Sequence, residues 1–548
     1  MMDRRELLKS SLLGCGVAVA SGALGSRLSR TVLADGTAPT EPIVKTTLGS
    51  LRGAYANGAY SFKGVHYGAS TAGAMRFMAP SPAKSWTGVR DALDFGSLAP
   101  QDLDWALVTP VLREFIGDMI PSGTMTEDCL LLNVWTPSLR PPSKRPVMVF
   151  LHGAGYHFGS SGIPLYDGTA LAAKHDVVVV GVNHRLNVFG FLYLARIGGA
   201  KYADSGNVGM LDMVLALQWV RSNIALFGGD PDNVTIFGES DGGAQVSTLM
   251  AMPPGKGLFH KAIVESGAQL RASSAEEADA SARQFLAKLH VTPDHVDDLQ
   301  SLPMDRLIAA LHAMGGDWAL ASNSVVDGRS LPRHPFDPDA PAATATVPMV
   351  IGTSYNEATS LMGLTDPPAF SLNEPDMRGK VKALLNVSDD SKLDALIALY
   401  RKNRPSATPS DIYFAIGTDA GWHMDAITQA ERKAAQHAAP TYMYVFAWPT
   451  PVMGGKLKAP HGIELPFVFD NLDKSARMVG SGTDLQPLAD RVAGAWTAFA
   501  RTGNPDHAGL PHWPAYETST RATMIFNDEC KVVNDPGKDE RLAMTSMR

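Results

Sequence analysis

The stretch "NVTIFGESDGG", Asn233–Gly243, places a glycine-flanked serine directly after a short apolar, β-branched run. The run predicts a buried strand, and the residues after the serine can start a helix. A G-x-S-x-G pattern alone is common, but between a strand and a helix it indicates a nucleophile elbow, a sharp turn that exposes the hydroxyl. Gly238 and Gly242 are expected there because side chains would crowd the turn. The stretch therefore predicts an α/β fold with a nucleophile at Ser240.

Further apolar runs resemble the one before Ser240 and alternate with helical segments such as Met210–Ile224. Strands are expected within Pro146–Gly153, Val177–Arg185, Asn233–Ser240, Lys261–Gly267, Val347–Glu357 and Thr441–Trp448. Near-continuous apolar strands separated by helices indicate a mostly parallel sheet with helices on both faces. Ligands of such sheets bind beyond the carboxyl ends of the strands, so the site is expected at that edge.

Composition indicates a large globular protein. The chain has 548 residues, 45% hydrophobic and 19% charged, and no repeat or linker interrupts it. Because the motifs extend along its whole length, we expect a single domain over residues 35–548. The net charge of -7, without a dense basic run, argues against nucleic acid as a partner. Outside the first residues no apolar stretch of about 18 residues is recognised, which argues against a membrane span.

Residues 1–34 have the order of an export signal. Arg4-Arg5 and Lys9 precede an apolar run from Leu12 to Leu24, and Val32 and Ala34 suit the -3 and -1 positions of a cleavage site. The paired arginines resemble a bacterial twin-arginine signal. We therefore expect residues 1–34 to be removed and the protein to be periplasmic or secreted.

A serine nucleophile needs amide donors for the developing oxyanion, and a histidine oriented by an acid. The loop "FLHGAGYHFG" follows the expected strand at Pro146, and its small residues Gly153, Ala154 and Gly155 let backbone amides approach a substrate. The chain has 15 histidines, and composition does not choose among them.

From Val44 to Tyr516 the sequence resembles the type-B carboxylesterases, the cholinesterase-like and para-nitrobenzyl-esterase-like branch of the α/β-hydrolases. The segments "FKGVHYG", "EDCLLLNVWTP", "NVGMLDMVLALQWVRSNIALFGGDPDNVTIFGESDGG" and "AWTAFARTGNPDHAGLPHWPAY" carry the resemblance. It implies an α/β-hydrolase fold, a large, mostly parallel central sheet with helices on both faces and long insertions that form an active-site gorge.

The resemblance also implies the site residues. Ser240 matches the nucleophile, Glu357 in "GTSYNEAT" the acid, and His461 in "HGIELPFVF" the base. The oxyanion donors are expected to be the backbone N–H groups of Ala154, Gly155 and Asp241. The implied activity is hydrolysis of a small-molecule ester through an acyl-enzyme, with water as second substrate and with neither a metal nor an organic cofactor.

Two carboxylates flank the nucleophile. Glu239 is the residue usual in the family, and we expect it to be buried and to steady His461 through water. Asp241 stands where the family usually has alanine. A carboxylate about 5–6 Å from the oxyanion would cost roughly 3 kcal/mol at an effective dielectric near 20. We therefore expect its side chain to point away, toward the start of the following helix, where it gains about 0.3–1 kcal/mol. The alternative is pKa tuning or contact with the substrate.

Other departures concern packing. Ala99 stands where the family often has a cysteine, so Cys129 is expected to be a buried thiol, and His66, where proline is usual, is interpreted as structural. Tyr156 and His157 either line the gorge or pack within their loop. Loops that vary within the family, such as Leu103–Ser122 and Leu361–Leu372, supply the pocket residues. The candidate pocket aromatics, for which packing is the simpler interpretation, are Trp105, Phe115, Phe370 and Trp422.

Two alternatives to ester hydrolysis remain. The same residues would also hydrolyse a carbamate, an amide or a lactone. A non-catalytic cholinesterase-like binding module is a different class, but such modules typically lack the serine. The sequence does not identify the substrate.

Overall fold

The computed structural model describes residues 41–103, 110–314, 323–481 and 484–547. These described residues belong to one compact unit. The expected export signal, residues 1–34, lies outside them.

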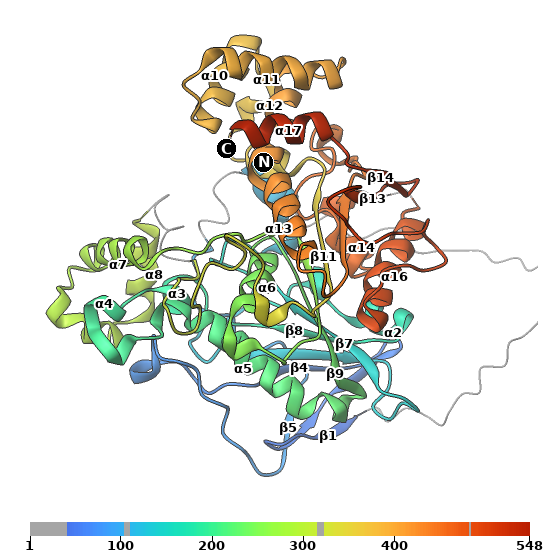
Figure 1. Cartoon of the computed structure of the whole chain (residues 1–548). Helices are drawn as coiled ribbons and strands as arrows, with labels where there is room; N and C mark the ends of the chain where they lie inside the picture. The colour runs from blue at the N-terminus through green and yellow to red at the C-terminus, as the bar shows by residue number, and fades with distance from the viewer. Residues whose placement is uncertain (1–40, 104–109, 315–322, 482–483, 548) are drawn as a thin grey trace, which may run out of the picture. The chain divides into compact units, whose positions relative to one another are not determined.

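The described residues build an eleven-stranded mixed sheet, which Figure 1 shows running through the molecule. Its strands are, in spatial order, β14 (Lys531–Asn534), β13 (Ala522–Phe526), β12 (Thr441–Phe446), β11 (Met349–Ser354), β10 (Lys261–Glu265), β9 (Gly229–Glu239), β7 (Arg145–Leu151), β8 (Val178–Val182), β6 (Leu131–Thr136), β4 (Ala59–His66) and β3 (Ala54–Ala56). The strands from β13 to β8 pair in parallel, and the outer strands pair antiparallel. A separate small sheet contains β1 (Ile43–Lys45), β2 (Ser50–Arg52) and β5 (Val89–Asp91).

The six strands expected from apolar runs are confirmed as β7 to β12, and the helix expected over Met210–Ile224 is α5 (Val208–Asn223). Five strands of the large sheet were missed. Of these, β3, β4 and β14 are short or only half buried, whereas β6 and β13 are largely buried runs that the sequence interpretation overlooked. The sequence did contain a recognisable turn motif for the β3–β4 hairpin. Asn57-Gly58 forms this turn, and both residues have positive φ. Asn-Gly between two strands is typical of such turns.

The two faces of the sheet bury separate apolar cores. Along β7, Val147, Val149 and Leu151 point to one face, and Met148 and Phe150 to the other. The first face is covered by α5, α6 (Asp241–Ala251) and α13 (Met424–Ala434), the second by α2 (Thr169–His175), α14 (Leu465–Val468) and α16 (Gln486–Thr502). Burial on both faces is why the central strands are continuous apolar runs.

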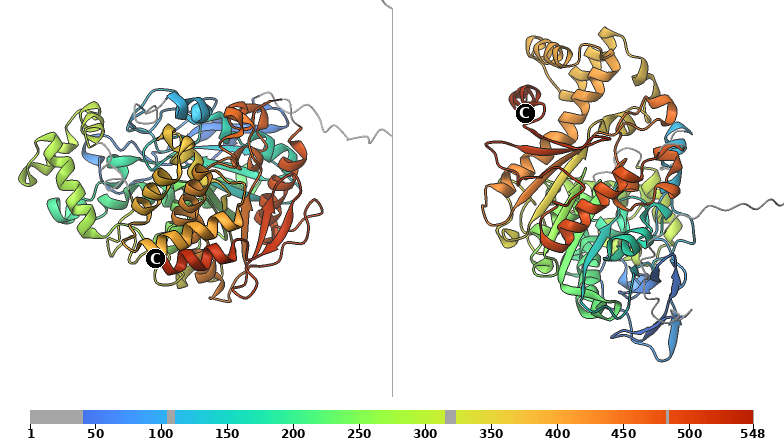
Figure 2. Two further views of the ribbon diagram at one scale, coloured as in Figure 1. Left: turned by 90° about the horizontal axis from the view of Figure 1, so that it is seen from above. Right: turned by 90° about the vertical axis from the view of Figure 1, so that its right-hand side faces the viewer.

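Two helical insertions have cores of their own. One contains α7 (Ala275–Leu289) and α8 (Met304–His312). The other contains α10 (Glu374–Leu385), α11 (Asp390–Asn403) and α12 (Pro409–Thr418), which pack with the last helix, α17 (Lys538–Met547). Figures 1 and 2 show α17 beside these three helices, although about 120 residues of chain separate it from α12.

Among the described residues, one helical stretch, Ser205–Phe227, is long and apolar enough to cross a membrane, and the sequence interpretation overlooked it. Its most apolar window is 67% buried inside the folded chain. The stretch contains α5, which packs on the sheet, so its apolar character is that of a core helix.

A buried ion pair fixes α5 to the loop after β8. Arg185, 2% exposed, donates to both carboxylate oxygens of Asp212, which is fully buried. Arg185 also donates to the Met78 carbonyl at 2.8 Å. A buried charge whose partner is removed is strongly destabilising, because water no longer reaches it.

We expect Asp212→Ala to lower the free energy of unfolding by about 3–5 kcal/mol, because Arg185 then remains buried without its counter-ion. Urea denaturation followed by circular dichroism measures this loss. Asp279→Ala, which breaks the surface pair with Arg283 on α7, is the control and should cost no more than about 1 kcal/mol. Similar small losses in both variants would contradict the expectation.

Candidate active site

Ser240 sits on a strained turn between β9 and α6. Its backbone has φ 58° and ψ -126°, a conformation that residues with a side chain rarely adopt. The turn packs so closely that a Cβ on Gly242 would lie 2.0 Å from the Leu151 carbonyl oxygen, and a Cβ on Gly267 would lie 2.0 Å from that of Ser240. Glycine is therefore required at both positions, and the backbone holds the Ser240 side chain at the end of the sheet.

The expected acid and base meet at the same end of the sheet. Glu357 begins α9 (Glu357–Leu361) after β11, and His461 lies in the loop between β12 and α14. His461 Nδ1 lies 2.5 Å from Glu357 Oε2, and the Ser354 N–H donates to Glu357 Oε1 at 2.7 Å. Both side chains are almost fully buried. The imidazole therefore has one ring nitrogen bound to an acid that the backbone orients, as a general base requires.

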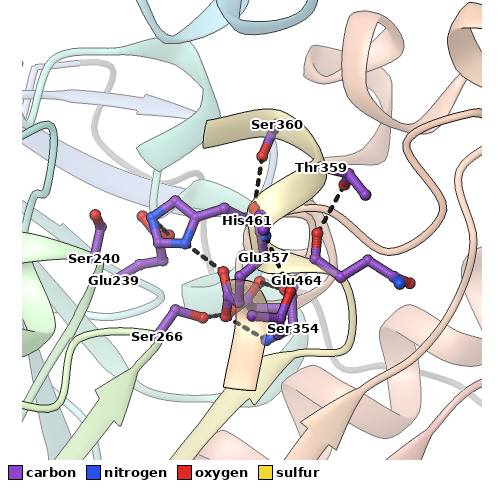
Figure 3. Close-up of polar contacts among 12 residues, drawn as sticks. Glu239, Ser240, Ser266, Ser354, Glu357, Thr359, Ser360, His461 and Glu464 are labelled. Carbon is purple, nitrogen blue, oxygen red and sulfur yellow. Dashed lines mark hydrogen bonds and ion pairs between the residues drawn. The ribbon is translucent and has the colours of Figure 1, made fainter. Parts of the chain in front are cut away.

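The other ring nitrogen of His461 faces Glu239. Nε2 lies 3.1 Å from Glu239 Oε1 and has no hydrogen-bond partner among the described residues. The expectation that Glu239 acts through water is thus wrong: the carboxyl group lies in direct contact with the ring. Figure 3 shows Ser240, Glu239 and His461 side by side. A hydrogen bond from Ser240 Oγ reaches Asp241 Oδ2 instead, at 3.5 Å.

Burial and charge oppose each other at His461. Burial disfavours the imidazolium, but the carboxylates of Glu239 and Glu357 outweigh it and raise the pKa of His461. Conversely, burial raises the pKa of Glu239, and His461 lowers it in part. Since only the neutral imidazole accepts a proton, this arrangement favours activity at higher pH.

The loop after β7, which was expected to supply the oxyanion donors, has three successive residues in the left-handed region. Ala154, Gly155 and Tyr156 have φ 82°, 71° and 58°. A Cβ on Gly153 would lie 2.5 Å from the Glu239 carbonyl oxygen, so this loop contacts the backbone next to the nucleophile. Such strain is typical of functional sites and places the amides of the loop beside Ser240.

Asp241 does not point away from the site, so that expectation is wrong. Its Oδ2 accepts a hydrogen bond from the Gly155 N–H at 2.5 Å. The orphan amide of the facing loop attracts the carboxylate more strongly than the start of α6 does, because it offers a direct, charge-assisted hydrogen bond. Burial raises the pKa of Asp241, and the Gly155 N–H and His461 lower it in part. The side chain thus occupies one of the three expected oxyanion donors.

Glu464 is a site residue that sequence reasoning missed. It is fully buried and accepts hydrogen bonds from Ser354 Oγ at 3.0 Å and Ser266 Oγ at 3.2 Å, which Figure 3 shows below His461. Burial raises its pKa to about 7. The sequence could have suggested Glu464, because it lies three residues after His461 in "HGIELPFVF". A buried acid close to a histidine of this kind tunes the pKa of that histidine.

A cavity of about 140 Å³ opens beside Ser240. It is lined by Ser240, Asp241, Ala244, Ser266, Gly267, Ala268, Gln269, Gly421, Trp422 and Asp425. Trp422 belongs to a π-helical turn, Asp419–His423, and its ring centroid lies 6.2 Å from that of His461. This candidate aromatic is therefore part of the pocket wall, although packing had been the simpler interpretation.

Of the other candidate aromatics, Phe115 and Phe370 do not line this cavity. Phe115 is buried in the core on the second face of the sheet, and the Phe370 ring packs against Phe414 in a tilted arrangement, with ring centroids 5.0 Å apart. Trp105 lies outside the described residues. Tyr156 packs edge-on against Phe191 at 4.9 Å, and His157 is also buried.

The remaining sequence expectations concern the cysteines and metals. Cys129 is a buried free thiol, as expected, and Cys530 is a free thiol as well. Within the described part of the chain, no group of three or more His, Cys, Asp or Glu residues is placed to hold a metal ion.

Comparison with known proteins identifies the family. A model of the carboxylesterase family matches residues 40–545. The para-nitrobenzyl esterase of Bacillus subtilis (strain 168) is 37% identical over 509 residues, which cover 92% of this chain and 98% of that protein. The phenmedipham hydrolase of Pseudarthrobacter oxydans is 33% identical and covers 93% of this chain and 100% of that protein. A crystal structure of a Geobacillus stearothermophilus carboxylesterase superposes with a TM-score of 0.79 at 38% identity, covering 92% of this chain and 99% of that one. This protein is a carboxylic ester hydrolase with the α/β-hydrolase fold, and it belongs to the carboxylesterase family.

Proposed function

We propose that Ser240, His461 and Glu357 carry the hydrolysis of a small-molecule ester through an acyl-enzyme. The observation that supports this most directly is the 2.5 Å contact between His461 Nδ1 and Glu357 Oε2, at the same end of the sheet as the Ser240 turn. A histidine held by an acid in one tautomer next to a strained serine is the arrangement that serine esterases need.

Each step moves one proton. His461 Nε2 takes the proton of Ser240 Oγ as Oγ bonds to the ester carbonyl carbon and the carbonyl oxygen becomes an oxyanion. The oxyanion then collapses, the bond to the alkoxy oxygen breaks, and His461 returns the proton to the leaving alcohol. A water molecule adds to the acyl-enzyme in the same way, releasing the carboxylic acid and regenerating Ser240. Glu357 stabilises the imidazolium that forms in each half-reaction.

The backbone N–H groups of Ala154, Gly155 and Asp241 are the proposed oxyanion donors. The left-handed backbone at Ala154 and Gly155 and the close approach of Gly153 to the Glu239 carbonyl support this role, since they bring the loop to the nucleophile. An oxyanion donor in a serine hydrolase contributes about 3 kcal/mol to the transition state.

Export is part of the proposal. The ordered basic, apolar and cleavage regions of residues 1–34 support a twin-arginine signal and a periplasmic or secreted protein. The twin-arginine route would carry the protein already folded.

Replacement of the nucleophile tests the proposed mechanism. We expect Ser240→Ala to lower kcat for p-nitrophenyl acetate by at least about 10⁴-fold, because no covalent intermediate forms. Stopped-flow release of p-nitrophenol measures both the burst and the steady state. Ser222→Ala on the outer face of α5 is the control and should keep full activity. Equal turnover by the Ser240 variant and wild type would rule out the proposed nucleophile.

Replacement of Glu239 tests the electrostatics of His461. Since the Glu239 carboxylate raises the pKa of His461, Glu239→Gln should lower that pKa and move the rising limb of kcat/KM to lower pH. A profile of kcat/KM from pH 5 to 10 measures the shift. Glu265→Gln is a matched control: that acid is also buried, but it bonds Trp496 Nε1 and does not contact His461. An unmoved limb in Glu239→Gln, or an equal shift in both variants, would contradict the expectation.

Replacement of the paired arginines tests export. Changing Arg4 and Arg5 together to Lys should retain the protein in the cytoplasm of a bacterial host, because twin-arginine transport depends on that pair. Fractionation and intact mass measure the outcome. The exported wild type should begin at Asp35, after Ala34. Equal export of the double-lysine variant would contradict a twin-arginine route.

A further inference from the structure

The carboxyl group of Asp241 stands where the substrate oxygen must go. In the proposed function the Gly155 N–H holds the oxyanion, yet here it donates to Asp241 Oδ2 at 2.5 Å. The same Oδ2 lies 3.5 Å from Ser240 Oγ, the attacking atom. Asp241 therefore lies between the nucleophile and one of its proposed oxyanion donors.

We infer that Asp241 is a restraining residue of the active site: its carboxylate occupies the Gly155 oxyanion donor in the resting enzyme, and the ester must displace it before the donor can act. The inference rests on the proposed oxyanion role of Gly155. It makes Asp241 a positioning residue that acts on the reaction through Gly155 and limits kcat/KM for neutral esters.

Geometry excludes simultaneous occupation. An oxyanion has to lie about 2.7–3.1 Å from its donors, along the same N–H direction that Oδ2 now uses. Two oxygen atoms cannot share that position, and one N–H provides a single good hydrogen bond. The carboxyl group must rotate away as the ester binds. The 140 Å³ cavity, which Asp241 lines together with Gln269, offers space for that rotation.

Charge makes the displacement unfavourable. A carboxylate accepting from an amide forms a charge-assisted hydrogen bond, stronger than the bond to a neutral ester carbonyl that replaces it. The titratable groups that face Asp241 are Tyr156 of the oxyanion loop, Glu239 of β9, His461 and, across the cavity, Asp425 of α13. None of them except His461 is a cation. The imidazolium that forms together with the oxyanion already faces the carboxylates of Glu239 and Glu357, so the negative charge of Asp241 still opposes the oxyanion.

The hydrogen bond from the Gly155 N–H to Asp241 Oδ2 also explains why the protein tolerates an aspartate at this position. It satisfies an amide of a loop whose backbone is left-handed at Ala154, Gly155 and Tyr156, and so it holds that loop on α6. Removing the carboxyl group should therefore loosen the loop while it frees the donor. Stability and activity are expected to change in opposite directions, a trade-off common at active sites.

The test compares wild type, Asp241→Ala and the nearly isosteric Asp241→Asn. Initial rates with p-nitrophenyl acetate are measured on the alkaline plateau, where His461 is neutral in every variant. We expect Asp241→Ala to raise kcat/KM about tenfold or more, mainly through kcat, while its Tm falls. Asp241→Asn should give a smaller increase, because its amide oxygen still accepts from Gly155 but carries no charge. Asp390→Ala, which removes the acid that begins α11, controls for loss of a helix-start charge and should leave the kinetics unchanged.

An oxyanion mimic gives the second measurement. A methyl trifluoromethyl ketone adds to Ser240 Oγ and forms a tetrahedral hemiketal whose oxyanion needs the same donors. Its inhibition constant should fall in each Asp241 variant by the factor by which kcat/KM rises. If Asp241 only stabilised the fold, the inhibition constant of the ketone would not change in proportion to kcat/KM.

The outcomes separate the inference from the function on which it rests. Folded Asp241 variants with unchanged or lower kcat/KM and unchanged ketone binding would overturn the inference, while the esterase mechanism would stand. Should Asp241→Ala not fold, the Asn variant decides in the same way. Absence of turnover from every variant would count against the proposed function, and ketone binding measured by calorimetry would still decide whether Asp241 restrains the site.

Discussion

The close approach of three backbone segments under Ser240 is the constraint on which the rest of the site depends. The end of β7, the turn at Ser240 and the segment just after β10 pack so tightly that Gly242 and Gly267 have no room for a Cβ. This contact fixes the strained dihedral angles of Ser240, and it also brings the loop that continues from β7 to the same place. A single packing contact therefore positions both the hydroxyl proposed to attack and the amides proposed to receive the charge.

The parallel strands then determine where the other groups stand. Ser240, Glu357 and His461, the proposed nucleophile, acid and base, follow β9, β11 and β12, whose carboxyl ends lie along one edge of the sheet. This places several buried carboxyl groups close together, which is unfavourable unless each is hydrogen-bonded. Ser266 and Ser354 donate to Glu464, and Trp496 donates to Glu265. These hydroxyl and indole donors stabilise the carboxyl groups of Glu464 and Glu265 beneath the site.

The parts of this structure that could be predicted from the sequence are those that depend on a local residue pattern or on a motif shared with the family. The central strands were predictable because burial on both faces makes them continuous apolar runs, and "FGESDGG" indicated the elbow because only glycine fits around it. Glu357 and His461 came from the family resemblance; nothing in the composition would have chosen them. The half-buried edge strands lacked such a pattern.

The orientation of Asp241 could not be predicted, because it depends on an amide 86 residues earlier in the chain. The expectation from the sequence considered only the N–H groups at the start of α6 as partners of the Asp241 carboxylate. The estimate of charge repulsion assumed that this carboxylate would not turn toward the oxyanion. Similarly, the direct contact between Glu239 and His461 follows from how two loops pack at the sheet edge. Contacts between segments distant in sequence decide such side-chain positions.

The insertion of α10, α11 and α12 between the strands of the acid and the base has an evolutionary consequence. Its apolar core is separate from the cores on the two faces of the sheet, yet the chain leaves it through the π-helical turn that carries Trp422 to the pocket. Substitutions in this insertion can therefore reshape the pocket wall while the sheet that aligns the reacting groups keeps its packing. The fold therefore keeps the packing of the sheet independent of the segment that shapes this part of the pocket wall.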